Sequence, residues 1–372
     1  MVRKSDARRR DTRMHHVKRL ASVVLAVAVL AARLLAGAPS AALVAAKTLD
    51  MYFIDVEGGQ ATLIVTPAGA SFLIDAGFPS DGTFNSKSGA PAQARDAQRV
   101  LAAARDAGLR QIDHLMVTHY HADHMGGVME LAQLIPIRSF IDHGAPSADA
   151  EVAVPGTQAL YEAYVALRAK GKHIEPKPGD RLPIKGVDVV VLASGGAVLT
   201  KPLAGAGAPN PSCTGEGVAA QEKTENTRST AVHVRYGKFS LLDVGDLTGR
   251  PLFALTCPAN LIGAASVYLV AHHGGADGSD PSLFAAVKPR VAIMNNGPRK
   301  GAQARTFATI AQMPTIDIWQ LHRSLNAGVE NMPDDRIANL DESTSAWIKV
   351  SANRDGSFTV TNGRTGFKKV YQ

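Results

Sequence analysis

Three histidines and one aspartate fall within six residues, directly after a short apolar run at residues 115–117. These candidate ligands are His119, His121, Asp123 and His124. Imidazole and carboxylate groups are the ligands that zinc and similar divalent metals select in proteins. On an extended chain His119 and His121 point the same way, because alternate residues of a strand share a face. A polar loop that is rich in histidine by chance does not explain this spacing, so the pattern predicts a metal site.

Acidic and histidine side chains also follow three other apolar runs. Asp75 ends the run that starts at Ser71, Asp246 follows a run ending at residue 244, and a His272–His273 pair follows a run ending at residue 270. Strand ends along one edge of packed sheets converge, and α/β proteins build their sites there. We therefore expect these side chains to join the first cluster, although an aspartate such as Asp75 also suits a simple turn.

The elements that must position these side chains can be read from apolar runs and the turn residues between them. The predicted strands cover residues 51–56, 61–66, 71–75, 111–117, 137–141, 229–236, 239–244, 266–270, 290–294, 345–350 and 357–361. The predicted helices cover residues 93–107, 125–134 and 157–169. A long loop rich in glycine and proline spans residues 194–228, and loops of this length are usually functional or partly disordered. The order of elements predicts an α/β protein with two similar halves.

The charge of the chain is concentrated at its N-terminus. Residues 1–46 hold nine Lys/Arg and two Asp, which accounts for the whole formal net charge of +7. An apolar run at residues 20–32 and small residues after it predict a signal peptide over 1–46, with cleavage between 38 and 46. An uncleaved signal anchor is the alternative. We expect an exported protein, periplasmic or secreted.

Residues 47–372 are then formally neutral, and this balance argues against strong nucleic-acid affinity. Basic residues could still line a groove, although scattered surface charge is the commoner explanation. These residues are Arg228, Arg299, Lys300 and Arg305. The two cysteines, Cys213 and Cys257, suit an oxidising compartment if they pair, and a disulfide between them is a hypothesis.

The motif His-x-His-x-Asp-His at residues 119–124 resembles that of the metallo-β-lactamase-fold hydrolases. Within that superfamily the chain looks most like the soluble hydrolase domain of ComEC-type competence proteins. The similar segments are residues 53–61, 73–77, 123–127, 245–247 and 270–274. The resemblance implies a single hydrolase domain over residues 47–372, folded as a four-layered αββα sandwich with mixed β-sheets.

The resemblance also implies a ligand set for one or two divalent metals, zinc first and manganese as an alternative. The first metal takes His119 and His121, the second takes Asp123, His124 and His272, and Asp246 bridges them. Three side chains are assigned to catalysis: Asp75, which orients ligands or water, Asp123, and His273, which contacts substrate or donates a proton.

One histidine of the superfamily pattern is missing between residue 124 and Asp246. Asn226 and Ser229 stand at the corresponding place, and they are predicted to replace the missing ligand or to contact substrate. The intervening histidines are His143, His173 and His233. The first metal is then weakly held, and a mononuclear enzyme stays open.

The function that follows is an exported metal-dependent hydrolase using metal-activated water. A phosphodiesterase or nuclease-type phosphoesterase, acting on a small-molecule or nucleic-acid phosphoester, is the leading hypothesis. A lactonase or β-lactamase-like hydrolase of C–O or C–N bonds is the alternative, and a non-catalytic binding module is the third. No stable protein partner is predicted.

Overall fold

The computed structural model describes residues 47–83, 87–213 and 224–372. Lys47–Gln372 forms one compact unit. The predicted signal peptide lies outside the described residues. Among the helices of the described ranges, none is long and apolar enough to cross a membrane.

The first sheet has nine strands and mixes both kinds of pairing. Its strands are, in spatial order, β18 (Lys368–Tyr371), β17 (Phe358–Asn362), β16 (Ile348–Ala352), β1 (Leu49–Phe53), β2 (Thr62–Val65), β3 (Ser71–Ile74), β4 (His114–Met116), β5 (Ser139–Ile141) and β6 (Lys172–Ile174). The strands from β3 to β6 pair in parallel. Those from β18 to β3 pair antiparallel. Both predicted hairpins, β1–β2 and β16–β17, are therefore confirmed.

The second sheet also has nine strands and is mixed in the same way. Its spatial order is β15 (Ile337–Asn339), β14 (Asp317–His322), β13 (Val291–Met294), β12 (Val267–Leu269), β11 (Phe239–Asp243), β10 (Ala231–Tyr236), β8 (Asp188–Ser194) and β7 (Arg181–Leu182), and β9 (Ala197–Val198) pairs with β8. The strands from β11 to β15 pair in parallel. The β10–β11 pair is the predicted antiparallel hairpin.

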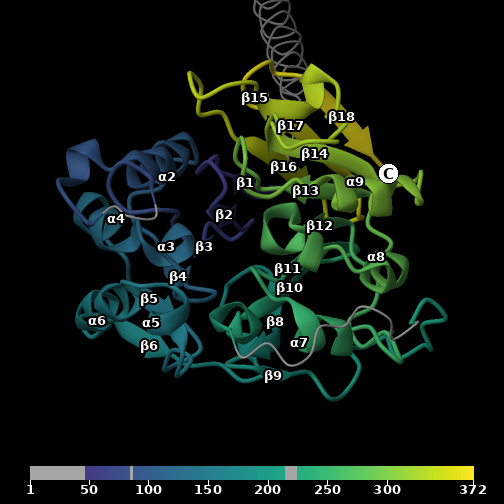
Figure 1. The fold of residues 1–372 in the computed structure, drawn as a ribbon, viewed down its shortest axis with the longest axis horizontal. Helices are drawn as coiled ribbons and strands as arrows, with labels where there is room; N and C mark the ends of the chain where they lie inside the picture. The colour runs from purple at the N-terminus through teal and green to yellow at the C-terminus, as the bar shows by residue number, and fades with distance from the viewer. Residues whose placement is uncertain (1–46, 84–86, 214–223) are drawn as a thin grey trace, which may run out of the picture. The chain divides into compact units, whose positions relative to one another are not determined.

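The core lies between the two sheets and is completed by helices on their outer faces. One cluster joins apolar residues of both sheets, for example Phe72 on β3 with Trp319 on β14, both fully buried. The outer face of the first sheet packs against α2 (Arg95–Asp106), α4 (Val128–Leu134) and α6 (Thr157–Arg168). The outer face of the second packs against α7 (Gly249–Ala254), α8 (Pro281–Val287) and α9 (Ala304–Ala311). Figure 1 shows α2, α4 and α6 on the opposite side of the sheets from α8 and α9. The predicted αββα sandwich is confirmed.

The shorter elements depart from the prediction. The helix predicted over 125–134 is two helices, α3 (Ala122–Met125) and α4, with Gly126 and Gly127 between them. A Cβ on Gly127 would stand 2.3 Å from the carbonyl oxygen of Ala76, so only glycine fits this close approach. The loop predicted over 194–228 contains β9 and the 3₁₀ turn η2 (Glu225–Arg228).

The hypothesised disulfide between Cys213 and Cys257 is present, with Cα atoms 5.7 Å apart. It ties the long loop to the segment after α7. Asn210, just before it, donates to the carbonyl oxygens of Thr256 and Ser282 at 3.0 Å each, which holds the same contact.

Candidate metal centre

The predicted site residues follow the carboxyl ends of two neighbouring strands in each sheet. Strands β3 and β4 are parallel neighbours in the first sheet, and β11 and β12 are parallel neighbours in the second. The two edges approach closely at Gly245, where a Cβ would stand 3.0 Å from Thr118 Cβ. Thr118 also accepts a backbone hydrogen bond of 2.8 Å from Thr230. The chain segments that carry ligands from both halves therefore meet at one place.

A first group joins two histidines and an aspartate. His119 Nε2 and His121 Nδ1 lie 2.9 Å apart. Asp246 Oδ2 lies 3.9 Å from His119 Nε2. All three ligand atoms fall within 4.8 Å of one another. The predicted pairing of His119 with His121 on one side of the chain is present.

A second group joins Asp123, His124, Asp246 and His273, all of them buried. His124 Nε2 lies 3.1 Å from Asp246 Oδ2 and 3.3 Å from Asp123 Oδ2. His273 Nε2 lies 3.2 Å from a carboxylate oxygen of each aspartate. Asp246 belongs to both groups, which is the geometry that a bridging ligand requires.

The donor set fits divalent metal ions. Two pairs of ring nitrogens face each other, His119 with His121 at 2.9 Å and His124 with His273 at 3.3 Å. A single proton can bridge the two nitrogens of one pair only, whereas one metal ion can accept the lone pairs of several nitrogens at the same time. Asp246 Oδ1 is buried and accepts no hydrogen bond from the described residues. Nitrogen and carboxylate ligands of this kind suit zinc, iron or manganese.

The charges of the site are coupled through burial. Burial lowers the pKa of His119, and the neighbouring His124 and His121 lower it further, well below the usual value. Burial also lowers the pKa of His124, but the carboxylates of Asp246, Asp123 and Asp75 outweigh it and raise the pKa well above the usual value. The three carboxylates therefore favour the charged form of His124 more than burial disfavours it.

Asp75 is not a member of either ligand group, but it contacts the ligand His124. Its Oδ2 lies 2.7 Å from His124 Nδ1, and its Oδ1 accepts the backbone N–H of Thr118 at 2.7 Å. The Thr118 hydroxyl donates to Oδ2 at 2.7 Å. An acceptor at Nδ1 holds the proton there and leaves His124 Nε2 as a lone-pair donor toward the group. This contact suits the orienting role that the sequence predicts for Asp75.

The structure places His273, rather than the expected His272, in the second ligand group. His273 is buried and enters the second group, whereas the His272 side chain is 26% exposed, with its Nε2 3.6 Å from Asp246 Oδ2. Both residues adopt left-handed backbone angles, with φ of 49° and 57°. This tight turn directs the second histidine inward, and such a turn cannot be read from two adjacent histidines in the sequence. His272 Nδ1 instead lies 2.9 Å from both carboxylate oxygens of Asp277.

The segment that replaces the missing histidine lies beside the first group. Glu225 accepts from the backbone N–H of Tyr120 at 3.3 Å and contacts His143 Nε2 at 2.9 Å. Two buried polar atoms of this segment, Asn226 Oδ1 and Ser229 Oγ, have no hydrogen-bond partner among the described residues. Both are thus available to a ligand, as predicted for a replacement position, and their role stays a prediction.

The other histidines between residue 124 and Asp246 are accounted for by structural contacts. His143 contacts Glu225, and His173 Nε2 lies 3.0 Å from Asp142. His233 lies on β10, where burial lowers its pKa to about 4. These three are not members of the metal-ligand groups among the described residues.

Lys300 is the basic residue that reaches the ligands. Its ammonium contacts Asp123 Oδ2 directly. Lys300 and Arg299 line a cavity of about 620 Å³ together with His272, His273 and Asp277. No spacing pattern in the sequence points to Asp277, because its contact with His272 depends on the turn between them.

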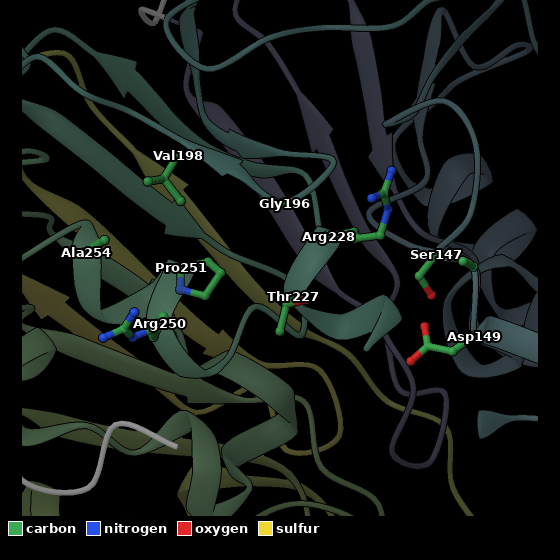
Figure 2. Close-up of a pocket in the computed structure, with 10 residues that line it drawn as sticks. Ser147, Asp149, Gly196, Val198, Thr227, Arg228, Arg250, Pro251 and Ala254 are labelled. Atoms are coloured by element: carbon green, nitrogen blue, oxygen red, sulfur yellow. The ribbon is translucent and has the colours of Figure 1, made fainter. Parts of the chain in front are cut away.

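A second cavity, of about 690 Å³, lies beside η2 (Figure 2). Arg228 and Arg250 line it from opposite sides in the view, with Val198, Pro251 and Ala254 as apolar lining. Arg305 lies exposed on α9 and lines neither cavity.

A third group of acids and histidine, Asp55, Glu57 and His322, also comes close together. Both of its carboxylates are already paired with arginines. Arg99 contacts Asp55 at 3.2 Å and Glu57 at 2.7 Å, and Arg95 contacts Glu57 at 2.5 Å. This group is an ion-pair network that joins the loop after β1 to α2.

Residues 54–213 match the model of the Metallo-beta-lactamase superfamily. The matched part includes Asp75 and the motif at residues 119–124, and it ends before Asp246 and His273. The match supports a domain of this superfamily and agrees with the sandwich architecture. No curated protein matches the chain.

Several solved structures are similar to the chain at low identity. A mutant of the CmlA beta-hydroxylase has 16% identity and a TM-score of 0.44, over 73% of this chain and 52% of that one. The metallo hydrolase Igni18 from Ignicoccus hospitalis has 15% identity and a TM-score of 0.40, over 77% and 100%. MEM-A1, a subclass B3 metallo-beta-lactamase from a soil metagenome library, has 15% and 0.36, over 73% and 85%. The chain spans about half the length of the CmlA structure, and likenesses this distant say nothing about its activity.

Proposed function

We propose that the protein is a metal-dependent hydrolase of the metallo-β-lactamase type, with its site at the edge where β3, β4, β11 and β12 end. The observation that carries this proposal is the position of Asp246, which belongs to both ligand groups. His119 and His121 would complete the first metal position with Asp246. Asp123, His124 and His273 would complete the second. A bound divalent metal supplies Lewis-acid polarisation and water activation.

The protein's own residues would position the ligands and the substrate. Asp75 holds the His124 ring through its Nδ1, and Glu225 anchors the backbone between His119 and His121. Ser229 and Asn226 follow Glu225 in the same segment, and each has a buried polar atom without a hydrogen-bond partner among the described residues. We infer that these two either complete that position or contact the substrate.

A phosphoester is the substrate class that the site favours. Two cationic side chains, Lys300 and Arg299, line the cavity beside His273. Cations near a metal pair stabilise the negative charge of a transferring phosphoryl group. The resemblance of the sequence motifs to those of ComEC-type hydrolase domains supports the same class, on either a small-molecule or a nucleic-acid phosphoester. The formal neutrality of residues 47–372 favours small substrates over strong nucleic-acid binding.

A lactonase activity is the second candidate, on one observation. The cavity beside η2 carries apolar lining from Val198, Pro251 and Ala254, which would suit an acyl chain (Figure 2).

We also propose that the protein is exported through a signal peptide within residues 1–46, and that residues 47–372 form a single hydrolase domain.

Metal analysis coupled to a substrate panel tests the proposed function. Purified protein is loaded with zinc or manganese and offered bis-p-nitrophenyl phosphate, DNA, RNA, an acyl-lactone and nitrocefin. We expect one or two bound metals and phosphodiester turnover that D246N abolishes. Lactone turnover without phosphodiester turnover selects the second candidate. A protein that binds no metal and keeps all its properties in D246N is the non-catalytic module.

A further inference from the structure

Lys300 contacts the same atom that a metal ion in the second position would need. Its ammonium lies against Asp123 Oδ2. That oxygen is also 3.2 Å from His273 Nε2 and 3.3 Å from His124 Nε2. The carboxylate oxygen therefore faces both ring nitrogens and the ammonium. A divalent cation at this place and the ammonium would repel each other at close range.

Backbone hydrogen bonds around Lys300 position it close to Asp123. The turn after β13 closes with Gly297 N–H donating to the Lys300 carbonyl oxygen at 2.9 Å. Ala302 N–H donates to the His273 carbonyl oxygen at 2.9 Å, which ties this turn to the second ligand group. A Cβ on Gly58 would stand 2.8 Å from Lys300 Cβ, so the lysine stem occupies space that glycine provides. The lysine is held in place at its backbone.

Burial explains why a cation beside Asp123 is favourable. The Asp123 side chain is only 2% exposed. A buried carboxylate without a counter-charge is costly, and the Lys300 ammonium supplies that charge.

The cavity beside the ligands has room for the Lys300 side chain if a metal displaces it from Asp123. Its side chain is 29% exposed and lines the cavity of about 620 Å³ that opens beside the ligands. Arg299 and His272 line the same cavity. A flexible lysine stem that turns from Asp123 into this cavity brings a second cation next to Arg299, where an anionic group of a substrate would bind.

We propose that Lys300 is an exchangeable counter-cation: it neutralises Asp123 in the metal-free site, and once a divalent metal takes Asp123 it binds the anionic group of the substrate. This inference rests on the proposed metal centre and deepens it. It assigns to one residue both a weakening of the second metal position and a preference for anionic substrates.

Zinc titration of the metal-free full-length protein, in competition with a chromophoric chelator, tests the exchange. K300M removes the charge and keeps a stem of similar length, and K300R keeps the charge. R299M is the matched control, because Arg299 carries the same charge and lines the same cavity. We expect K300M to tighten the zinc equivalent bound at the second position on the order of tenfold, as removal of one close cation predicts. K300R and R299M should each change it less than about threefold.

The anion step has its own readout. Zinc-loaded wild type and K300M are titrated with inorganic phosphate, and K300M should bind it on the order of tenfold more weakly. Circular dichroism and thermal midpoints establish that the variants are folded. Equal zinc affinity in wild type and K300M, or an equal gain in K300M and R299M, overturns the exchange, as does unchanged phosphate affinity. Absence of zinc binding in every variant contradicts the metal centre itself, so the two failures are distinguishable.

Discussion

His124 Nδ1 lies 2.7 Å from Asp75 Oδ2, while the other ring nitrogen of His124 faces the carboxylates of Asp123 and Asp246. One side chain thus links the end of β3 to the centre of the ligand groups. The hydrogen bond fixes which nitrogen is protonated, and it fixes the plane of the ring. Asp75 is a positioning residue on this geometry.

Replacing Asp75 by Asn should weaken zinc binding by about 10- to 100-fold, the usual cost of losing an orienting partner of a metal-bound histidine. Asp75 accepts with one oxygen from the Thr118 backbone and with the other from His124 Nδ1. Asparagine has a single acceptor oxygen and cannot serve both, so either His124 or Thr118 loses its acceptor. Chelator competition measures the change, and the exposed Asp180 offers D180N as a control. Unchanged zinc affinity in D75N would show that ring orientation does not depend on this carboxylate.

The two adjacent histidines give a second prediction, because only His273 enters the second group. H273N should lose one zinc equivalent or weaken it by at least about tenfold, since a first-coordination ligand is removed. H272N should keep both equivalents within about threefold, because His272 contacts Asp277 instead. Metal stoichiometry by mass spectrometry under native conditions measures both. The opposite pattern would restore His272 as the ligand.

The strand ends could be predicted because apolar runs stop where the sheet stops. Strands β3, β4, β11 and β12 each end one residue before the predicted end. The choice between His272 and His273 could not be predicted in the same way. It depends on two consecutive left-handed residues, a backbone conformation that the residue types disfavour and only the surrounding packing imposes.

Several strands were missed, among them the longer β8 and β14 and three short ones. Strands β6, β7 and β9 have two or three residues each, too few to show a period, and β6 and β9 bury little of their surface. The contact of Lys300 with Asp123 spans 177 residues of sequence. The sequence left a basic groove open as the less common explanation of these charges, and only the turn after β13 decides which basic residue reaches the ligands.

Asp243 gives a prediction on pH. Burial is the main cause that raises its pKa to about 7, and the nearby Asp75 raises it further, although Gly245 N–H donates to it. The unfolded value is about 3.9. The folded state therefore holds this proton longer than the unfolded state, so its contribution to stability is present below about pH 4 and is lost as the pH rises to about 7.

D243N removes this titration and keeps an acceptor for Gly245. In the metal-free protein, D243N should raise the free energy of unfolding at pH 8 by on the order of 2 kcal/mol relative to wild type. The difference between the two proteins should shrink toward pH 4. Urea unfolding at both pH values measures it, and a constant difference across this range would contradict the shift.

The disulfide between Cys213 and Cys257 gives the last prediction. It closes a sequence separation of 44 residues that includes η2, next to the first ligand group. Loss of such a cross-link lowers the free energy of unfolding by at most about 4 kcal/mol, mainly through the unfolded chain. The double variant C213S/C257S should therefore unfold at lower urea than wild type, while His119 and His121, anchored by Glu225 rather than by the disulfide, keep their zinc equivalent. Wild type with a reducing agent is the matched comparison. If the double variant also loses the first zinc equivalent, the position of η2 beside the ligands depends on the disulfide, and the hydrogen bond from Tyr120 to Glu225 is not sufficient.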